Sequence, residues 1–301
     1  MFSLINSMVY YSINDLEKIT GVKAHTIRIW EKRYNVITPE RTATNIRCYS
    51  DDDLKKLLNI SLLNRYGYRI SSIIQMSPVE INEKVVRISE IATDFEIQVD
   101  SLMVSMIELS EDKFEKVLSN SILRLGFENT ITKIVYPFLE KVGLLWQVGS
   151  INPAQEHFTS NLIRQKLIIA IDGLQSINGL YSKTFILFLP SNEFHELSLL
   201  FYHYVIKQMG HKVIYLGQTV PVKEVVRADK IRSADFVFTT ITTSLLAEEY
   251  KELIHDIASR FAERIVFISG KQVHEQNMEL PNNVVAVSSV DHFRSELSMR
   301  L

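Results

Sequence analysis

The stretch that decides the fold of the amino-terminal region reads Gly21-Val-Lys-Ala-His-Thr-Ile-Arg-Ile-Trp-Glu-Lys-Arg-Tyr34. Within it, Val22, Ile27 and Trp30 fall on one side of a helix, and polar and basic residues occupy the rest of its surface. A shorter amphipathic helix over 13–19 precedes it, and Gly21 between the two can take the positive φ of a tight turn. This spacing predicts a helix-turn-helix, whose second helix can enter the major groove of DNA.

The polar stretch 39–50 that follows predicts a β-hairpin wing with its tip at 42–45, and a helix over 52–66 completes the region. Arginines flank this tip, where guanidinium groups can hold the phosphate backbone. We expect Trp30 and Cys48 to be packed side chains. The residues that we expect to contact DNA are Lys23, His25, Thr26, Arg28, Lys32, Arg33, Arg41 and Arg47.

Composition and charge limit the classes of protein that fit. The chain has 301 residues, of which 46% are hydrophobic and 23% charged, which excludes a disordered chain, a coiled-coil rod and a collagen-like fibre. Residues 1–78 carry a net charge of +4 and the remainder −6, so the basic head is suited to a polyanion. A single cysteine, no export signal and no apolar run near the ~20 residues of a membrane span predict a cytoplasmic protein without a membrane partner.

The rest of the chain divides into a helical part and an alternating part. Residues 79–178 are helical in pattern, with helices over 95–109, 113–125, 129–145 and 153–174, and predict a four-helix bundle. Residues 179–301 alternate strands and helices, with strands over 184–189, 211–216, 235–240, 264–269 and 284–287. The expected fold is therefore multidomain: an all-α winged helix-turn-helix (1–78), a four-helix bundle (79–178) and a Rossmann-like, doubly wound parallel sheet of five strands (179–301).

A histidine follows the first strand of this sheet, where other doubly wound folds carry a glycine-rich phosphate loop. Glu193 and His195 are two residues apart, so the carboxylate can accept the Nδ1 proton and direct Nε2 to a metal. A lone loop histidine is more often a surface residue, and no second histidine or cysteine stands beside it. Cobalt in a corrin brings its own equatorial ligands, however, and needs only one ligand from the protein.

Two resemblances join these parts. The motifs of residues 10–76, above all Arg-Ile-Trp-Glu-Lys-Arg-Tyr34, resemble the winged helix-turn-helix of the MerR family, and are most similar to its light- and cobalamin-responsive branch. The sequence Glu193-Phe-His-Glu-Leu-Ser198, with Ser244-Leu-Leu246 and Ser269-Gly270 after later strands, resembles the cobalamin-binding fold of corrinoid enzymes. Together they resemble photoreceptor regulators of the CarH, CarA and LitR type over nearly the whole chain.

The second resemblance implies roles for particular residues. His195 would be the lower axial ligand of cobalt and Glu193 would orient it, while Trp146 in the bundle would shield the upper ligand. The remaining cofactor-binding residues that it implies are Glu156 for the adenosyl ribose, the adjacent His157, Ser198 in the motif after the histidine, and Ser244, Leu246 and Gly270 for the slot that takes the nucleotide tail.

This chain departs from the pattern at three positions. Ser198 and Ser269 stand where the relatives have glycines close to the tail, and Gln147 stands where light-sensing relatives have a histidine after the tryptophan. The first two departures bear on whether cobalamin binds, and the third on whether light is the signal, because an amide is a poor cobalt ligand.

The resemblance implies a non-enzymatic, cobalamin-dependent repressor that binds double-stranded operator DNA as a dimer or tetramer. Adenosylcobalamin or another cobalamin would be the cofactor, and the upper ligand of cobalt would switch the assembly, in the relatives through light. Two alternatives stay open. In one, a MerR-like regulator has lost cobalamin and uses its α/β domain to bind protein; in the other, the chain is a corrinoid methyl carrier or methyltransferase component.

Overall fold

The computed structural model describes residues 10–42, 44–91, 94–147, 151–175, 182–275 and 278–301. The chain forms two compact units, residues 1–162 and 163–301, and the division falls inside helix α10 (Pro153–Asp172). The three domains expected from the sequence have other boundaries, and that division stays a prediction.

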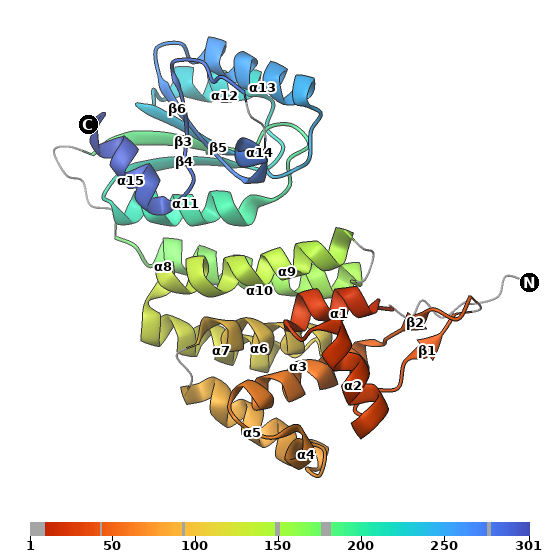
Figure 1. Cartoon of the computed structure of the whole chain (residues 1–301). Coiled ribbons are helices and arrows are strands. Elements are labelled where there is room, and N and C mark those ends of the chain that lie inside the picture. The colour runs from red at the N-terminus through yellow and green to blue at the C-terminus, as the bar shows by residue number, and fades with distance from the viewer. Residues whose placement is uncertain (1–9, 43, 92–93, 148–150, 176–181, 276–277) are drawn as a thin grey trace, which may run out of the picture. The chain divides into compact units, whose positions relative to one another are not determined.

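The first unit is helical apart from one small hairpin (Figure 1). Before α10, its elements are α1 (Ile13–Thr20), α2 (Ala24–Tyr34), β1 (Glu40–Arg41), β2 (Arg47–Cys48), α3 (Asp51–Arg65), α4 (Ile70–Ile73), α5 (Pro78–Ile91), α6 (Phe95–Ile107), α7 (Glu111–Leu125), α8 (Phe127–Thr130), the π-helical segment η1 (Ile131–Val135) and α9 (Tyr136–Gln147).

Capping residues set the beginnings of α1 and α3. Ser12 accepts a hydrogen bond from the Asp15 amide, and the Asp15 carboxylate accepts one from the Ser12 amide. Ser50 and Asp53 form the same reciprocal pair at α3. The sequence predicted that α3 begins at residue 52, but it begins at Asp51, because the Ser50 hydroxyl accepts from the Asp53 amide that the helix leaves unpaired.

The helix-turn-helix and its wing are as predicted. Gly21 ends α1 with a φ of 71°, and α2 begins three residues later. Strands β1 and β2 pair antiparallel, with Glu40 opposite Cys48. An isolated bridge between Tyr11 and Tyr49 attaches the base of the hairpin to the chain before α1.

In the bundle, α6 packs against α7, η1 and α9, and α7 packs against α8. Phe114 of α7 and Phe138 of α9 are both fully buried and meet edge to face at 5.7 Å between ring centroids. Thr130 and Thr132 bond back to carbonyls one turn earlier, on either side of the start of η1. In the described ranges no helix is both long and apolar enough to cross a membrane.

The second unit is a doubly wound α/β domain. Its elements after α10 are β3 (Thr184–Phe188), α11 (Glu196–Gln208), β4 (Lys212–Gly217), α12 (Val222–Ile231), β5 (Phe236–Thr240), α13 (Ala247–Arg260), β6 (Ile265–Ser269), α14 (Lys271–Glu275), β7 (Val284–Ala286) and α15 (Val290–Ser298). The five strands are all parallel, in the order β4-β3-β5-β6-β7, which confirms the predicted fold class.

The helices cover both faces of this sheet: α11 and α15 lie on one face, and α12 and α13 on the other (Figure 1). Helix α15 was not predicted. Its signals are nevertheless local, because the Ser289 hydroxyl accepts from the His292 amide and Val290, Phe293 and Leu297 form its buried side.

Candidate functional site

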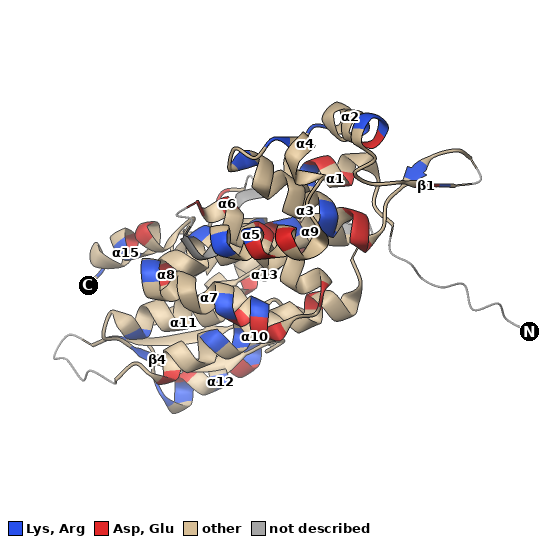
Figure 2. Cartoon of the chain, turned by 90° about the horizontal axis from the view of Figure 1, so that it is seen from below, with Lys and Arg blue, Asp and Glu red and all other residues tan. Residues whose placement is uncertain are grey.

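Helix α2 turns one side to the core and presents the other to solvent. Ile27 is fully buried and Trp30 is 7% exposed, which confirms Trp30 as a packed side chain. Predicted DNA contacts on the opposite side are exposed, namely His25, Arg28 and Lys32, and Lys and Arg mark both α2 and β1 in Figure 2. Between them lies Ile29, 49% exposed, which sequence reasoning missed and which can contact a thymine methyl group.

Other predicted DNA contacts have partners within the protein. The Lys23 ammonium lies 3.1 Å from a Glu17 carboxylate oxygen, and the Arg33 guanidinium lies 5.5 Å from the centre of the Tyr34 ring. Thr26 is half-buried. Lys23 and Arg33 therefore make contacts within the helix-turn-helix in addition to adding to its positive charge.

The wing holds its two arginines differently. Arg41 is exposed and donates to the Asn45 side-chain oxygen at 2.7 Å across the tip, where Asn45 takes the left-handed conformation with φ of 64°. Arg47 is half-buried, and its Nε lies 3.3 Å from Glu31 of α2, whose carboxylate also accepts from the Tyr49 hydroxyl. Arg41 is therefore the more available to a phosphate, and Arg47 attaches the wing to α2.

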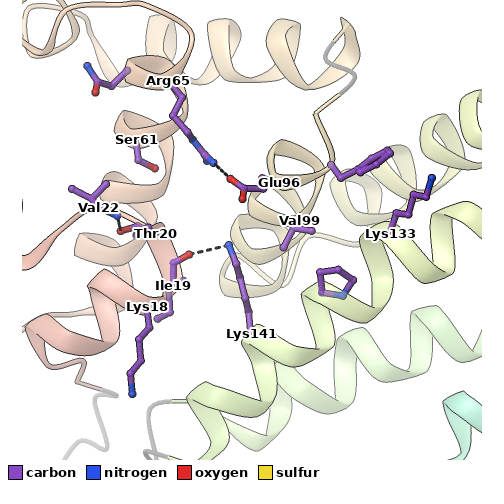
Figure 3. A pocket seen from close by; sticks show the side chains of 14 residues that line it. Lys18, Ile19, Thr20, Val22, Ser61, Arg65, Glu96, Val99, Lys133 and Lys141 are labelled. Atoms are coloured by element: carbon purple, nitrogen blue, oxygen red, sulfur yellow. Dashed lines mark hydrogen bonds and ion pairs between the residues drawn. The ribbon is translucent and has the colours of Figure 1, made fainter. Parts of the chain in front are cut away.

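A buried ion network joins the helix-turn-helix to the bundle. Asp100 of α6 is 2% exposed and bonds both the Arg65 guanidinium of α3 and, at 2.9 Å, the Lys141 ammonium of α9. Lys141 also donates to the Ile19 carbonyl near the end of α1, at 2.9 Å (Figure 3). Arg65 reaches Glu96 as well, at 2.7 Å, so one cluster ties α1 and α3 to α6 and α9 along a cavity of about 620 Å³.

The bundle residues of the expected cofactor site lie near the end of α9 and the start of α10. Trp146 is 52% exposed, which is unusual for a large aromatic side chain. One Glu156 oxygen accepts from the Ser160 hydroxyl at 2.5 Å, and the other lies 2.8 Å from Nδ1 of the exposed His157. Gln147 ends α9, and its side chain lies outside the described residues.

The loop after β3 holds Glu193 and His195 as the sequence suggested. The Glu193 side chain is buried, and its Oε1 lies 2.6 Å from Nδ1 of His195. The same carboxylate accepts from the amides of Thr242 and Thr243, both at 2.7 Å, and from the Thr243 hydroxyl at 3.1 Å. The His195 side chain itself is 61% exposed. One carboxylate thus fixes both the ring and the loop that follows β5.

These contacts also fix the charge of the carboxylate. Burial raises the pKa of Glu193, but hydrogen bonds from the His195 ring and from the amides of Thr243, His195 and Thr242 outweigh it and lower the pKa to about 2. An ionised carboxylate at Nδ1 keeps the proton on that nitrogen and makes Nε2 the nitrogen that faces a metal.

The loop after β4 is hydrogen-bonded to the loop that carries His195. The Asn192 amide donates to the Thr219 hydroxyl at 3.2 Å, and the Gln218 side chain donates to the Phe194 carbonyl at 2.8 Å. Phe194 and Leu246, on the loops beside the histidine, are 61% and 73% exposed. Sequence reasoning did not consider Phe194; an apolar residue next to the histidine that is expected to bind cobalt would have been the signal.

The remaining predicted residues lie at the carboxyl ends of the strands. Ser244 is exposed in the loop after β5, and Ser198 is half-buried in the first turn of α11. Ser269, at the end of β6, is buried, and its hydroxyl donates to the Val287 carbonyl at 3.0 Å. Gly270 has a φ of 108°, and a Cβ there would lie 2.4 Å from the Ile241 carbonyl oxygen.

The geometry fits one part of a cobalamin and not another. The Glu193–His195 pair has the donor set and the orientation of an axial ligand. Two of the positions expected near the nucleotide tail contact other parts of the protein instead: the Tyr202 hydroxyl of α11 lies 3.4 Å from the Ser269 hydroxyl, and Gly270 packs directly on the backbone of Ile241.

Two family models match parts of the chain. Residues 11–78 match the model of the MerR HTH family regulatory proteins, and residues 98–170 match a B12 binding domain. The chain carries a MerR-type helix-turn-helix and a B12-binding domain. The second match covers the helical region that carries Trp146 and Glu156, and the cofactor of the regulator is a cobalamin.

Two curated relatives of the regulator come from Myxococcus xanthus. The HTH-type transcriptional repressor CarH is 28% identical over 250 residues, covering 81% of this chain and 83% of that protein. The HTH-type transcriptional repressor CarA is 24% identical over 265 residues, covering 87% of each chain. These matches support transcription regulation and DNA binding.

Solved structures similar to the regulator are more distant. The Methanosarcina barkeri monomethylamine corrinoid protein aligns with a TM-score of 0.48 and 14% identity, over 65% of this chain and 94% of that one. A cobalamin-binding protein from Desulfitobacterium hafniense DCB-2 aligns with a TM-score of 0.31 and 15% identity, over 69% and 98%.

Proposed function

We propose that this cobalamin-binding MerR-type regulator is a repressor that binds operator DNA as a homo-oligomer and is switched by the upper ligand of cobalt. The observation that carries the proposal is the Glu193–His195 pair, with 2.6 Å between the carboxylate and Nδ1. We further propose that it works in the cytoplasm, that it is not an enzyme, and that its domains divide near residues 78 and 178.

The DNA-binding surface would combine α2 and the wing tip. Arg28 and Lys32 on the exposed side of α2 would reach base edges or phosphates, His25 and Ile29 would add contacts in the major groove, and Arg41 would hold the backbone beside it. In MerR-type dimers two such surfaces would read the two halves of an operator.

Each of the expected cofactor-binding residues would have its own role. His195 would bind cobalt through Nε2, with Glu193 holding its ring, and Phe194 and Leu246 would offer apolar surface to the corrin. Trp146 would cover the upper ligand, and Glu156 would accept hydrogen bonds from an adenosyl ribose. When bound, adenosylcobalamin supplies a cobalt–carbon bond that light can break.

The contacts of α9 would link Trp146 to the helix-turn-helix. Trp146 and Lys141 lie on α9, five residues or about one and a half helical turns apart. Because Lys141 bonds the Ile19 carbonyl of α1, a displacement of α9 at Trp146 would move the contact that positions the helix-turn-helix (Figure 3).

Reconstitution tests the proposal. The purified chain is loaded with adenosylcobalamin in the dark, and its visible spectrum, its mass in solution and its affinity for a fragment of its own promoter are measured before and after illumination. We expect a bound corrinoid spectrum, a larger assembly and tighter DNA binding in the dark, with loss of both on illumination.

The His195→Ala variant is the control, since it removes the axial ligand and leaves the helix-turn-helix intact. It should bind DNA without responding to cobalamin. If the variant and the wild type respond identically, the proposed switch is wrong. A protein that takes up no corrinoid but still represses would favour a regulator whose α/β domain binds a protein partner. A corrinoid protein that binds no DNA at low salt would favour a methyl carrier.

A further inference from the structure

One layer of the α/β unit is packed with aromatic rings. It lies between the sheet and the two helices α11 and α15. Its members, all at most 5% exposed, are Phe185, Phe236, Phe238 and Phe267 from three strands, Tyr202 from α11 and Phe293 from α15. Rings at these contacts pack as closely as the interior of a protein allows.

Tyr202 closes the carboxyl-terminal end of this layer. Its ring lies 4.3 Å from that of Phe238 and 5.6 Å from that of Phe293, with an interplanar angle of 84° to the latter. Its hydroxyl lies 3.4 Å from Ser269 Oγ, which itself donates to the Val287 carbonyl. Ser269, which stands at the position of a family glycine, is therefore hydrogen-bonded to the backbone of the core, and its hydroxyl faces Tyr202.

The second wall of the expected slot is closed by backbone. The Ile241 amide donates to the Ser269 carbonyl at 2.8 Å, and the Gln272 amide donates to the Ile241 carbonyl at 3.2 Å. A Cβ on Gly270 would come within 2.9 Å of the amide nitrogen, carbonyl carbon and carbonyl oxygen of Ile241. The absence of a side chain at Gly270 thus allows two segments of the protein to come into direct contact.

The axial ligand does not depend on this layer. His195 lies in the loop before α11 and is oriented by Glu193, whose other partners are Thr242 and Thr243. We infer that the chain holds its corrinoid through His195 without inserting the nucleotide tail between α11 and the sheet. Its ligand class is then corrinoids with or without a lower nucleotide, cobinamides included. This inference rests on the proposed function, which assigns His195 to cobalt.

The test compares two ligands on the full-length protein. Aquocobalamin carries the nucleotide tail and diaquocobinamide lacks it, and both are titrated in the dark by absorbance. We expect diaquocobinamide to bind at least as tightly as aquocobalamin, because in aquocobalamin His195 must displace the benzimidazole of the tail from the cobalt and the displaced tail gains no site of its own. A protein that buries the tail recovers that cost and binds cobalamin far more tightly. A preference for cobalamin of more than tenfold would overturn the inference and leave the proposed function standing. Failure to bind either ligand would overturn both.

Variants of the aromatic layer test whether the nucleotide tail enters it. Thr240 of β5 pairs with Ser269 across the strands, and among the described residues its buried hydroxyl has no partner, so a tail that entered the layer would meet it. Thr240→Val should change neither dissociation constant; selective weakening of cobalamin would contradict the inference. Tyr202→Ala should open the slot and create a preference for cobalamin, with Tyr202→Phe as the matched control.

A spectroscopic measurement separates metal ligation from tail binding. Cobinamide has no benzimidazole of its own, so nitrogen superhyperfine splitting in its reduced Co(II) complex would come from the protein; we expect this splitting in the wild type and its loss in His195→Ala. If the cobinamide complex forms without nitrogen ligation, His195 does not hold the metal in the absence of the tail and the inference fails.

Discussion

Replacing Asp100 with asparagine removes the charge at the centre of the network between the helix-turn-helix and the bundle. Asp100 is 2% exposed, whereas its partners Arg65 and Lys141 keep 33% and 25% of their side-chain surface. Breaking a fully buried ion pair costs about 3–5 kcal/mol, and the partial exposure of both cations reduces this, so we expect about 3 kcal/mol. Lys141→Met should cost about 1–2 kcal/mol, because Arg65 still neutralises the carboxylate.

The assay is urea unfolding followed by tryptophan fluorescence. Both tryptophans, Trp30 and Trp146, belong to the first unit, so their emission reports on this unit alone. In the double variant Asp100→Asn/Lys141→Met the two losses should overlap by about 1 kcal/mol, because the residues share a contact. Asp112→Ala, an exposed acidic residue of α7, is the control and should cost less than about 1 kcal/mol. An Asp100→Asn midpoint equal to that of the control would refute the reasoning.

Three further predictions concern the α/β unit and the DNA-binding surface. Burial, with a smaller effect of Lys207, lowers the pKa of His203 from 6.5 to about 4. The cofactor-free α/β unit should therefore keep its full stability above pH 6.5 and lose about 2–3 kcal/mol as the pH falls towards 4. Urea unfolding followed by circular dichroism over a pH series measures this loss; His203→Phe should flatten it, and an unchanged slope would contradict the prediction. Gly270→Ala should lower the melting temperature of the same unit by several degrees, since φ is 108° and its Cβ would overlap backbone, and a melting curve like that of wild type would show that the loop can move. Arg28→Ala should weaken binding to an operator fragment by about tenfold or more and reduce the difference in affinity between operator and unrelated DNA. Arg41→Ala should weaken binding to operator and to unrelated DNA by the same factor. Fluorescence anisotropy measures these affinities, and equal affinities for wild type and Arg28→Ala would show that Arg28 is not in the interface.

Most of the fold could be predicted from patterns of residues that are close in sequence. The strands of the α/β unit were readable because parallel strands buried on both faces are continuous apolar runs, as in Phe185 to Phe188. The helix-turn-helix was readable from Gly21 and the apolar side of α2. Helix α15 was not predicted, although its Ser289 cap and the spacing of its apolar residues are local signals.

The site could be predicted only where its residues are neighbours in sequence. Glu193 and His195 are two apart, and their contact follows from the spacing. Ser269 meets Tyr202 67 residues away, and Lys141 meets Ile19 122 residues away, so no local pattern reveals either contact. Ser269 was recognised as a departure from a glycine, but what fills the space beside it depends on the packing of the whole layer.

The many bonds of Glu193 have a consequence for the speed of sensing. Five hydrogen bonds hold this carboxylate, from His195 and from the loop after β5, before any ligand arrives. An imidazole so fixed loses little freedom when it coordinates a metal, so ordering of the protein adds little delay to capture. The time course of a response would then follow the lability of the bond at cobalt.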